Sequence, residues 1–262
     1  MLDFGFYNMD CMDGMREFPD KYFDLAIVDP PYGIHITERH VWPGKGSKTV
    51  RKVAVIGKNE RKPRPTDKAS WNFYKNPADR RFYHPFDDSS PPDETYFREL
   101  IRVSKNQIIW GGNFFLDYLG AATCFVVWDK GRRNMDQADC ELAWTSLPGQ
   151  SRIFNFKWNG MLQEDMKEKE YRIHPTQKPM RLYEWLLQKF AKQGDVILDT
   201  HVGSASSLVA CQRLGFKYVG FEIDEDYYNL AKHRLETEGA QMTIFNFIQE
   251  ESDNEIVHDR HP

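Results

Sequence analysis

A proline-rich turn that begins with an acid follows an apolar run near the start of the chain. The run covers residues 24–28, and the turn reads Asp29-Pro30-Pro31-Tyr32-Gly33. Because proline has no N–H and a fixed φ, the turn offers acceptors in set directions, namely the Asp29 carboxylate and the carbonyl of Pro30 or Pro31. The Tyr32 ring stands beside them. The turn suits a flat substrate that carries an amino group, although a plain surface turn has a similar composition.

A loop of small residues nearer the C-terminal end is typical of a nucleotide site. An expected strand leads into Thr200-His201-Val202-Gly203-Ser204, and a helix follows. Such a loop lets backbone N–H groups approach a ligand closely. Glu222 stands 23 positions after Asp199, at the end of the next expected strand, where a carboxylate can hold ribose hydroxyls. Together they predict a nucleoside-bearing cofactor, and the lack of a GxxxxGK[ST] motif argues against a P-loop ATPase or GTPase.

The apolar runs predict the elements that must position these two groups. Strands are expected at 2–9, 24–28, 107–110, 124–128, 141–145, 195–198 and 218–223. Helices are expected at 92–103, 180–191, 206–214 and 226–236, with a short helical connection at 13–18. Because strands and helices alternate, we predict an α/β fold with a mainly parallel sheet. Ligands of such sheets bind beyond the carboxyl ends of the strands, which is where Asp29 stands.

Composition excludes several classes of protein. The chain has 262 residues, of which 40% are hydrophobic and 28% charged, as in a globular enzyme. The most apolar region, 108–128, is broken by glycines and polar residues and is interpreted as buried core, with no membrane span. Residues 1–10 carry two acids and no base, which argues against a secretory signal. The four cysteines have no CxxC spacing, so neither a disulfide framework nor a metal site is expected, and the default location is the cytoplasm.

Charge is unevenly distributed along a chain whose net charge is -4. Residues 38–84 carry 13 bases against 4 acids, whereas residues 236–262 carry 1 base against 7 acids. The basic segment is interpreted as an insertion that faces phosphates, and a solvated loop is the alternative. The acidic tail, 250–262, is expected to be a disordered terminus. Within the basic segment the predicted DNA contacts are Lys45, Lys48, Arg51 and Lys52.

The turn at Asp29-Pro30-Pro31-Tyr32 resembles the catalytic motif of S-adenosylmethionine-dependent amino-methyltransferases that act on adenine in DNA. Three further matches lie in consistent order along the chain: 8–12 with 23–28, 174–179, and 199–204 with 220–224. A catalytic motif that precedes the cofactor motif is the permuted order of the beta class of these enzymes. The resemblance covers most of the chain outside residues 38–84 and the tail. It implies one catalytic domain, 1–262, with a permuted Rossmann-like fold and helices on both faces of a twisted sheet.

The resemblance also implies roles for individual residues. S-adenosylmethionine would donate the methyl group to N6 of an adenine flipped out of double-stranded DNA. Asp29, Pro30 and Pro31 would hold the amino group, and Tyr32 would stack on the base. The implied cofactor contacts are Asp10, Cys11, Asp29, Lys178, Asp199, Thr200, His201, Val202, Gly203, Ser204, Glu222 and Ile223.

The cofactor loop departs from the family pattern at three positions. Thr200 and His201 replace the usual Pro-Phe pair, and Ala205 stands where the second glycine would be. A methyl group at Ala205 is tolerable if the residue has a negative φ and costly if φ is positive.

Sequence readout and partners are expected outside the catalytic sheet. Residues 130–172, with Arg132 and Arg133, form a second candidate region for target recognition besides 38–84. With no nuclease motif in view, we predict a stand-alone methyltransferase, with or without a separate nuclease, and by analogy a homodimer. The alternatives are cytosine-N4 methylation, whose enzymes more often carry Ser at the Asp29 position, methylation of RNA or of a protein glutamine, and an inactive DNA-binding protein.

Overall fold

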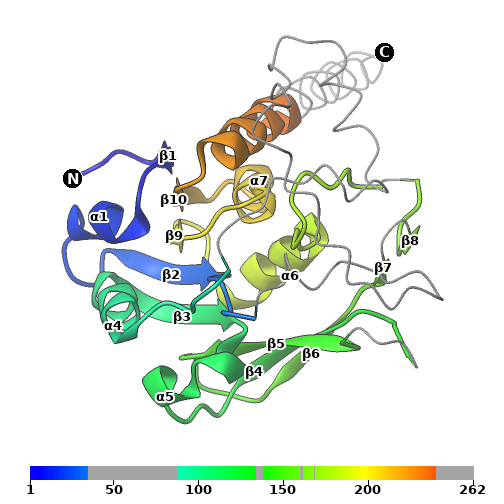
Figure 1. The fold of residues 1–262 in the computed structure, drawn as a ribbon, viewed down its shortest axis with the longest axis horizontal. Coiled ribbons are helices and arrows are strands. Elements are labelled where there is room, and N and C mark those ends of the chain that lie inside the picture. Colours follow the sequence, from blue (N-terminus) through cyan, green and yellow to red (C-terminus); the bar gives the residue numbers. More distant parts are fainter. Residues whose placement is uncertain (35–87, 134–137, 160–161, 168, 240–262) are drawn as a thin grey trace, which may run out of the picture.

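Eight strands form one mixed sheet, in the order β1-β10-β9-β2-β3-β5-β4-β6 (Figure 1). The computed structural model describes residues 1–34, 88–133, 138–159, 162–167 and 169–239. The sheet strands are β1 Gly5–Asn8, β2 Phe23–Val28, β3 Ser104–Trp110, β4 Phe125–Asp129, β5 Cys140–Thr145, β6 Arg152–Asn155, β9 Val196–Asp199 and β10 Lys217–Glu222. A separate two-stranded pair consists of β7 Trp158–Asn159 and β8 Leu162–Gln163.

The strand order confirms the permuted arrangement. The five strands β1, β10, β9, β2 and β3 run parallel, although β9 and β10 come last along the chain. In the sheet, β9 and β10 lie between β1 and β2, which come first along the chain. The strand β5 is antiparallel to both β3 and β4. Its first residues therefore lie at the edge of the sheet where β2 and β3 end.

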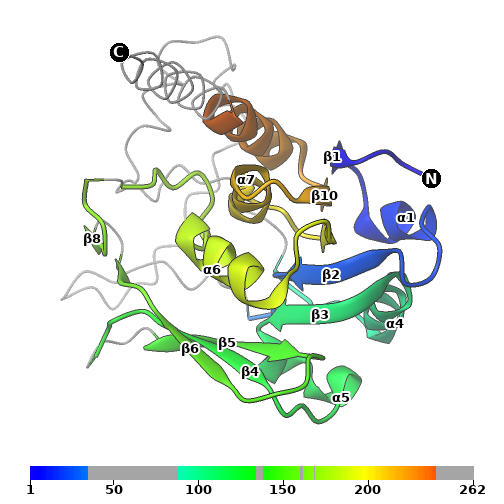
Figure 2. The same cartoon turned by 180° about the vertical axis from the view of Figure 1, so that it is seen from behind.

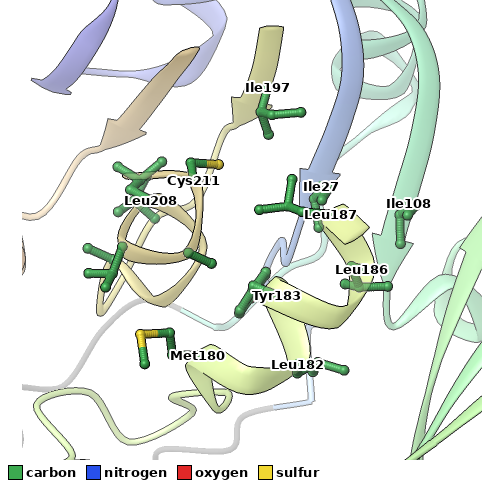
Figure 3. Close-up of a cluster of buried hydrophobic side chains, with 14 of the residues drawn as sticks. Ile27, Ile108, Met180, Leu182, Tyr183, Leu186, Leu187, Ile197, Leu208 and Cys211 are labelled. Carbon is green, nitrogen blue, oxygen red and sulfur yellow. The ribbon is translucent and has the colours of Figure 1, made fainter. Parts of the chain in front are cut away.

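Helices cover both faces of the sheet, as predicted (Figures 1 and 2). On one face lie α1 Cys11–Arg16, α4 Glu94–Val103 and α5 Leu116–Leu119, and on the other lie α6 Met180–Phe190, α7 Ser206–Arg213 and helical residues 225–239. Successive side chains along a strand point to opposite faces of the sheet, so the strands contribute to two hydrophobic cores. Ile27 packs in the core on the side of α6 and α7, and Val28 packs in the core on the side of α4. Figure 3 shows the first core, in which Leu186 and Leu187 of α6 lie close to Ile27 and Ile108.

The expected strands and helices are present, with ends that differ by a few residues. The helix α1 begins at Cys11 rather than at 13, because the Asp10 carboxylate accepts a hydrogen bond from the Met12 N–H and caps it. The region 108–128 is only partly strand: β3 ends at Trp110, Gly111 turns the chain at φ +67, and a 3-10 turn, Gly112–Phe114, precedes α5. The strands β6, β7 and β8 are additions to the predicted set.

Some predictions concern residues outside the described ranges. These are the basic insertion 38–84, the acidic tail 250–262, and the DNA contacts Lys45, Lys48, Arg51 and Lys52. Within the described ranges, no helix combines the length and the apolar character needed to cross a bilayer.

Candidate active site

Two neighbouring strands bring the proline-rich turn, residues 29–33, and the small-residue loop, residues 200–204, to one edge of the sheet. The strand β2 ends just before Asp29, and it pairs in parallel with β9, which ends at Asp199. Next to β9 lies β10, which ends at Glu222. The three carboxylates therefore follow three adjacent strands at their carboxyl ends, the edge at which parallel sheets bind ligands.

The Asp29 carboxylate is held by two donors. The Tyr32 hydroxyl donates to Oδ1 over 2.6 Å, and the Lys178 ammonium lies 2.5 Å from Oδ2. Lys178 Nζ is also 3.2 Å from the Tyr32 hydroxyl and 3.1 Å from Oε2 of Glu141. Glu141 is in turn paired with Lys130. Asp29 thus belongs to a buried network of two ammonium groups, two carboxylates and a phenol.

Burial and ion pairing compete in this network. Burial disfavours the Lys178 ammonium, yet Asp29 and Glu141 outweigh it and raise the pKa of Lys178 above its ordinary value. Burial likewise opposes ionisation of Glu141, but Lys178 and Lys130 lower the pKa of Glu141 to about 2. The pKa of Lys130 is lowered by burial, which Glu141 offsets only in part. At neutral pH Lys178 and Glu141 are therefore both charged.

The Tyr32 ring is packed closely on several sides. Phe114 stacks on it with ring centroids 5.2 Å apart, and Phe115 meets it edge-on at 6.2 Å. A Cβ at Gly111 would lie 2.2 Å from the ring, so only glycine fits beneath it. Phe114 itself is 49% exposed. The Tyr32 ring, which is predicted to stack on the base, is thus already stacked on Phe114. Phe114 is the more exposed of these two aromatic side chains.

The carbonyls of Pro30 and Pro31 accept no hydrogen bond from any residue in the described part of the chain. Pro30 is buried and Pro31 is half-buried. Because proline lacks an N–H, the turn also offers no competing donor at these two positions. Together with the remaining lone pairs of Asp29, these carbonyls form the acceptor surface that the sequence predicts.

The residues that replace the Pro-Phe pair form a hydrogen-bonded chain onto α4. Thr200 Oγ1 lies 2.6 Å from the Tyr96 hydroxyl and 2.9 Å from Nδ1 of His201. Burial lowers the pKa of His201 to about 4, so its imidazole is neutral at physiological pH. Asp199 accepts hydrogen bonds from the His201 N–H, at 3.0 Å, and from the Ser207 hydroxyl. Burial raises the pKa of Asp199 to about 7.

Glu222 fastens the loop to the end of β10. Its Oε2 accepts the Gly203 N–H at 2.8 Å, and its Oε1 accepts the Asp224 N–H at 2.9 Å. Burial raises the pKa of Glu222. The Val202 N–H donates to the Phe221 carbonyl, and Ile223 is 70% exposed. The loop is thus held through its own backbone N–H groups, which donate to the Glu222 carboxylate and the Phe221 carbonyl. The apolar side chain of Ile223 beside it is exposed.

Ala205 takes the backbone conformation that favours glycine. Its φ is +60 and its ψ is 20, and its side chain is fully buried. A positive φ is the costly case for an alanine at this position, because its Cβ is crowded by the backbone. The loop around it is braced by Arg234, which donates to the Ser204 carbonyl at 2.9 Å and pairs with Glu170 at 2.9 Å.

The remaining cofactor predictions fall into two groups. Asp10 and Cys11 follow β1, beside the end of β10, and the Asn8 amide donates to the Glu222 carbonyl at 2.8 Å. Burial, and secondarily Asp10, raises the pKa of the Cys11 thiol to about 12, so the thiol is neutral. Lys178, also predicted beside the cofactor, places its ammonium 2.5 Å from Oδ2 of Asp29.

Sequence reasoning missed Glu141, Phe114 and Tyr96 as parts of the site. Glu141 stands in a strand that otherwise reads as apolar, and an isolated acid in such a strand was the available signal. Phe114 and Tyr96 carry no signal of their own, because aromatic residues are common in cores.

The two described DNA candidates differ in exposure. Arg132 is partly buried and donates through Nε to the Trp158 carbonyl at 3.1 Å. Arg133 is exposed and pairs with the Asp129 carboxylate at 2.6 Å. Only Arg133 has the exposure expected of a phosphate contact.

Comparison with known proteins agrees with this geometry. A family model described as DNA methylase matches residues 47–233, more than two thirds of the chain. The methylase YubD of Escherichia coli strain K12 is 24% identical over 238 residues, which cover 88% of this chain and 89% of that protein. The solved structure of a DNA modification methylase of Thermus thermophilus has a TM-score of 0.50 at 17% identity, covering 90% of this chain and 96% of that one. It shares the fold.

Stronger identity is confined to a shorter segment. The type II methyltransferase M2.DpnII of Streptococcus pneumoniae is 41% identical over 81 residues, which are 31% of this chain and 30% of that protein. The aligned segment thus spans less than a third of the curated type II relatives it matches. The family model, in contrast, matches the continuous range 47–233, from the basic segment through β10 into helical residues 225–239. This match places the chain in the DNA methylase family.

Proposed function

We propose that the chain transfers a methyl group from S-adenosylmethionine to N6 of adenine in double-stranded DNA. One observation carries the proposal: the Asp29 carboxylate and the carbonyls of Pro30 and Pro31 follow the strand next to the Asp199 loop, and these carbonyls accept no hydrogen bond from the described residues. An amino group held there would lie at the same sheet edge as a cofactor held by the loop. Family membership supports DNA as the substrate.

The residues around the loop fit S-adenosylmethionine. The Glu222 carboxylate keeps lone pairs beyond the two N–H groups that it accepts, and these can take ribose hydroxyls. The exposed Ile223 offers apolar surface to a purine, and the exposed Asp10 stands beside it at the end of β1. The atoms nearest to a Cβ built at Gly203 belong to the His174 ring, at 3.8 Å, which is an ordinary van der Waals distance. The bound cofactor supplies an activated methyl group on its sulfonium.

Asp29 and the turn make the amino nitrogen a better nucleophile. The lone pair of an exocyclic amine is delocalised into the base, which weakens its attack. Hydrogen bonds from the amino group to Asp29 and to the Pro30 or Pro31 carbonyl favour a pyramidal nitrogen and localise the lone pair. Lys178 and Tyr32 hold the carboxylate in place, and Asp29 or water takes the proton. The base must leave the duplex to reach this turn.

Finer points of the function rest on resemblance. The carboxylate at position 29 favours adenine over cytosine, whose enzymes more often carry serine there. A homodimer, a separate cognate nuclease, a cytoplasmic location, and the roles of residues 38–84 and 130–172 in DNA contact stay predictions.

The test is methyl transfer to unmethylated plasmid DNA, followed by nucleoside digestion and mass spectrometry. We expect N6-methyladenine from the wild type, and none from a folded Asp29→Ala variant that still binds S-adenosylhomocysteine. N4-methylcytosine would correct the base and keep the mechanism. Cofactor binding with no methyl in DNA would overturn the choice of substrate.

A further inference from the structure

Glu141 lies in the active site although its strand is far from the catalytic turn in sequence. The strand β5 runs antiparallel to β3, so its start, at Cys140 and Glu141, lies at the carboxyl edge of β2 and β3. Glu141 pairs in register with Trp128 of β4, and Lys130 follows that strand at the same edge. The mixed part of the sheet therefore delivers a carboxylate and an ammonium to the site.

Lys178 is shared among three acceptors. Its Nζ reaches Asp29 Oδ2 at 2.5 Å, Glu141 Oε2 at 3.1 Å and the Tyr32 hydroxyl at 3.2 Å. The contacts with Asp29 and Tyr32 are hydrogen bonds, and the contact with Glu141 is an ion pair without hydrogen-bond geometry. Only 3% of the Lys178 side chain is exposed, which leaves little water to replace a lost partner. Removing any one acceptor must shift the ammonium toward the others.

Glu141 sets the strength with which Lys178 binds Asp29. With both carboxylates present, the ammonium is divided between two anions. With Glu141 neutral, Asp29 becomes its single anionic partner, and the carboxylate is drawn toward Lys178 and away from an amino group on the open side of the turn. Lys130, the second partner of Glu141, keeps that carboxylate charged and directed into the network.

We propose that Glu141 is a positioning residue for methyl transfer, which acts through Lys178 to hold the Asp29 carboxylate in the geometry that accepts the target amino group. The inference rests on the proposed function, and it adds a residue that the catalytic turn and the cofactor loop do not contain. Glu141 is not expected to touch the base or the cofactor.

The experiment compares three proteins with the wild type. Glu141→Gln removes the charge but leaves the Lys130 ammonium buried without its carboxylate, which weakens the fold. The double variant Lys130→Met with Glu141→Gln removes both members of that pair and keeps the site electrically balanced. Glu184→Gln is the matched control, because Glu184 pairs with Arg213 between α6 and α7, away from the site.

Four quantities are measured for each protein: kcat and KM for plasmid DNA, the Kd of S-adenosylhomocysteine, and the pH profile of kcat. The groups that face Lys178 are Asp29, Tyr32 and Glu141 by contact, with Lys130, Tyr183 and His174 nearby. Loss of Glu141 removes one of two anions, so the pKa of Lys178 falls. We expect kcat to fall about tenfold or more, with KM and Kd within about twofold, and the alkaline limb of the profile to move to lower pH.

The outcomes separate the inference from the function on which it rests. The expected pattern in the double variant, with Glu184→Gln at wild-type values, supports the inference. An unchanged kcat and an unchanged alkaline limb overturn it and leave the proposed function standing. A raised KM with no movement of the limb assigns Glu141 a purely structural role and also overturns it. A wild type that binds S-adenosylhomocysteine but transfers no methyl overturns the proposed function, and the inference with it.

Discussion

Ala205 combines two opposing contributions to stability at one residue. Its left-handed backbone costs about 1 kcal/mol relative to glycine. Its fully buried methyl group recovers about 0.8 kcal/mol, and an alanine restricts the unfolded chain by a further ~0.5 kcal/mol. These terms nearly cancel, so the loop that we propose to hold the cofactor can carry alanine at this position.

We therefore expect Ala205→Gly to leave the free energy of unfolding within about 1 kcal/mol of the wild type. Ala205→Val should lose about 2 kcal/mol or more, because a branched side chain is strained at positive φ and there is no room around it. Urea denaturation of both variants measures this. A large loss in Ala205→Gly would mean that methyl packing, rather than backbone strain, dominates at this position.

Phe114 is an exposed aromatic residue beside Asp29 and Tyr32, and we expect it to meet a flipped base. It stacks on Tyr32 and is 49% exposed, so its outer surface is available to a second ring. Base stacking on an aromatic side chain is worth about 1–3 kcal/mol. Phe114→Ala should raise KM for DNA about tenfold, while the Kd of S-adenosylhomocysteine stays unchanged. Phe114→Leu should lose less than Phe114→Ala if apolar contact contributes as well, and an unchanged KM in both would remove Phe114 from base binding.

His174 makes stability depend on pH in a direction that can be worked out. Burial, with Arg172 and Lys178, lowers the pKa of His174 to about 3. The unfolded chain takes up a proton below about pH 6.5, and the folded chain does not, so stability falls as the pH drops from 6.5 toward 3. Asparagine can keep the acceptor that the Thr176 hydroxyl contacts at 3.0 Å, without titrating.

The His174→Asn variant should therefore be less sensitive to acid than the wild type. Between pH 7.5 and pH 5 the wild type should lose about 2 kcal/mol that the variant keeps. Guanidinium denaturation across this range measures the difference in the free energy of unfolding. A difference that does not change with pH would mean that His174 titrates normally in the folded protein.

At the scale of elements, the sequence predicts what local patterning controls. The continuous apolar run before Asp29 and the run before Asp199 predict β2 and β9, because buried parallel strands have little alternation. Resemblance adds the order of the motifs and so the permuted sheet. In contrast, β6 has an exposed pattern in which Ile153 is 62% exposed, and β7 and β8 have two residues each, so none of these produces a periodic signal.

The site was predictable to the extent that its residues lie within motifs. Asp29, Tyr32 and Glu222 follow strand ends and could be found from spacing. Glu141 could not be placed, because its role depends on β5 running antiparallel, which is a property of the folded sheet. The contact between Lys178 and Asp29 could not be predicted either, since it joins positions 149 residues apart.

The end of β3 supports the catalytic turn directly. Gly111 has φ +67, and a Cβ there would lie 2.2 Å from the Tyr32 ring. Gly120 is a comparison position without that contact: its φ is +70, its ψ is -167, and nothing lies within 4 Å of the corresponding Cβ. Alanine should cost about 1 kcal/mol of stability through the left-handed backbone at Gly111, to which the clash with Tyr32 is added. At Gly120 it should cost about 1–3 kcal/mol, because essentially only glycine adopts that backbone region.

Only Gly111→Ala should also lose methyl transfer, because it displaces Tyr32 from Asp29. Thermal unfolding and kcat for both variants separate the two effects. Equal activity in Gly111→Ala and Gly120→Ala would mean that the position of Tyr32 is unimportant for transfer. A loss in both would point to the backbone of the 111–120 segment instead.

At the scale of the whole molecule, charge distribution must bring an acidic protein onto DNA. The net charge is -4, and the basic segment 38–84 alone carries 13 of the 35 bases, so the rest of the chain is strongly acidic. Long-range attraction to phosphates must therefore come from a local surface rather than from the molecule as a whole. Each phosphate that a lysine or arginine neutralises adds about 0.9 to the magnitude of the slope of log K against log salt concentration.

This gives the basic segment a quantitative test. Replacing Lys45, Lys48, Arg51 and Lys52 by Gln should reduce that slope by about 3 to 4 if all four contact phosphates. The control removes the same charge from exposed positions outside the segment: Arg16, Arg98, Lys189 and Lys192. Binding of a fluorescent duplex is measured between about 50 and 200 mM salt, and both variants should keep wild-type affinity for S-adenosylhomocysteine. If the control flattens the slope as much as the test variant, only net charge matters. If neither variant changes the slope, the lysines and arginines that contact phosphates lie elsewhere in the chain, and the exposed Arg133 is the next to test.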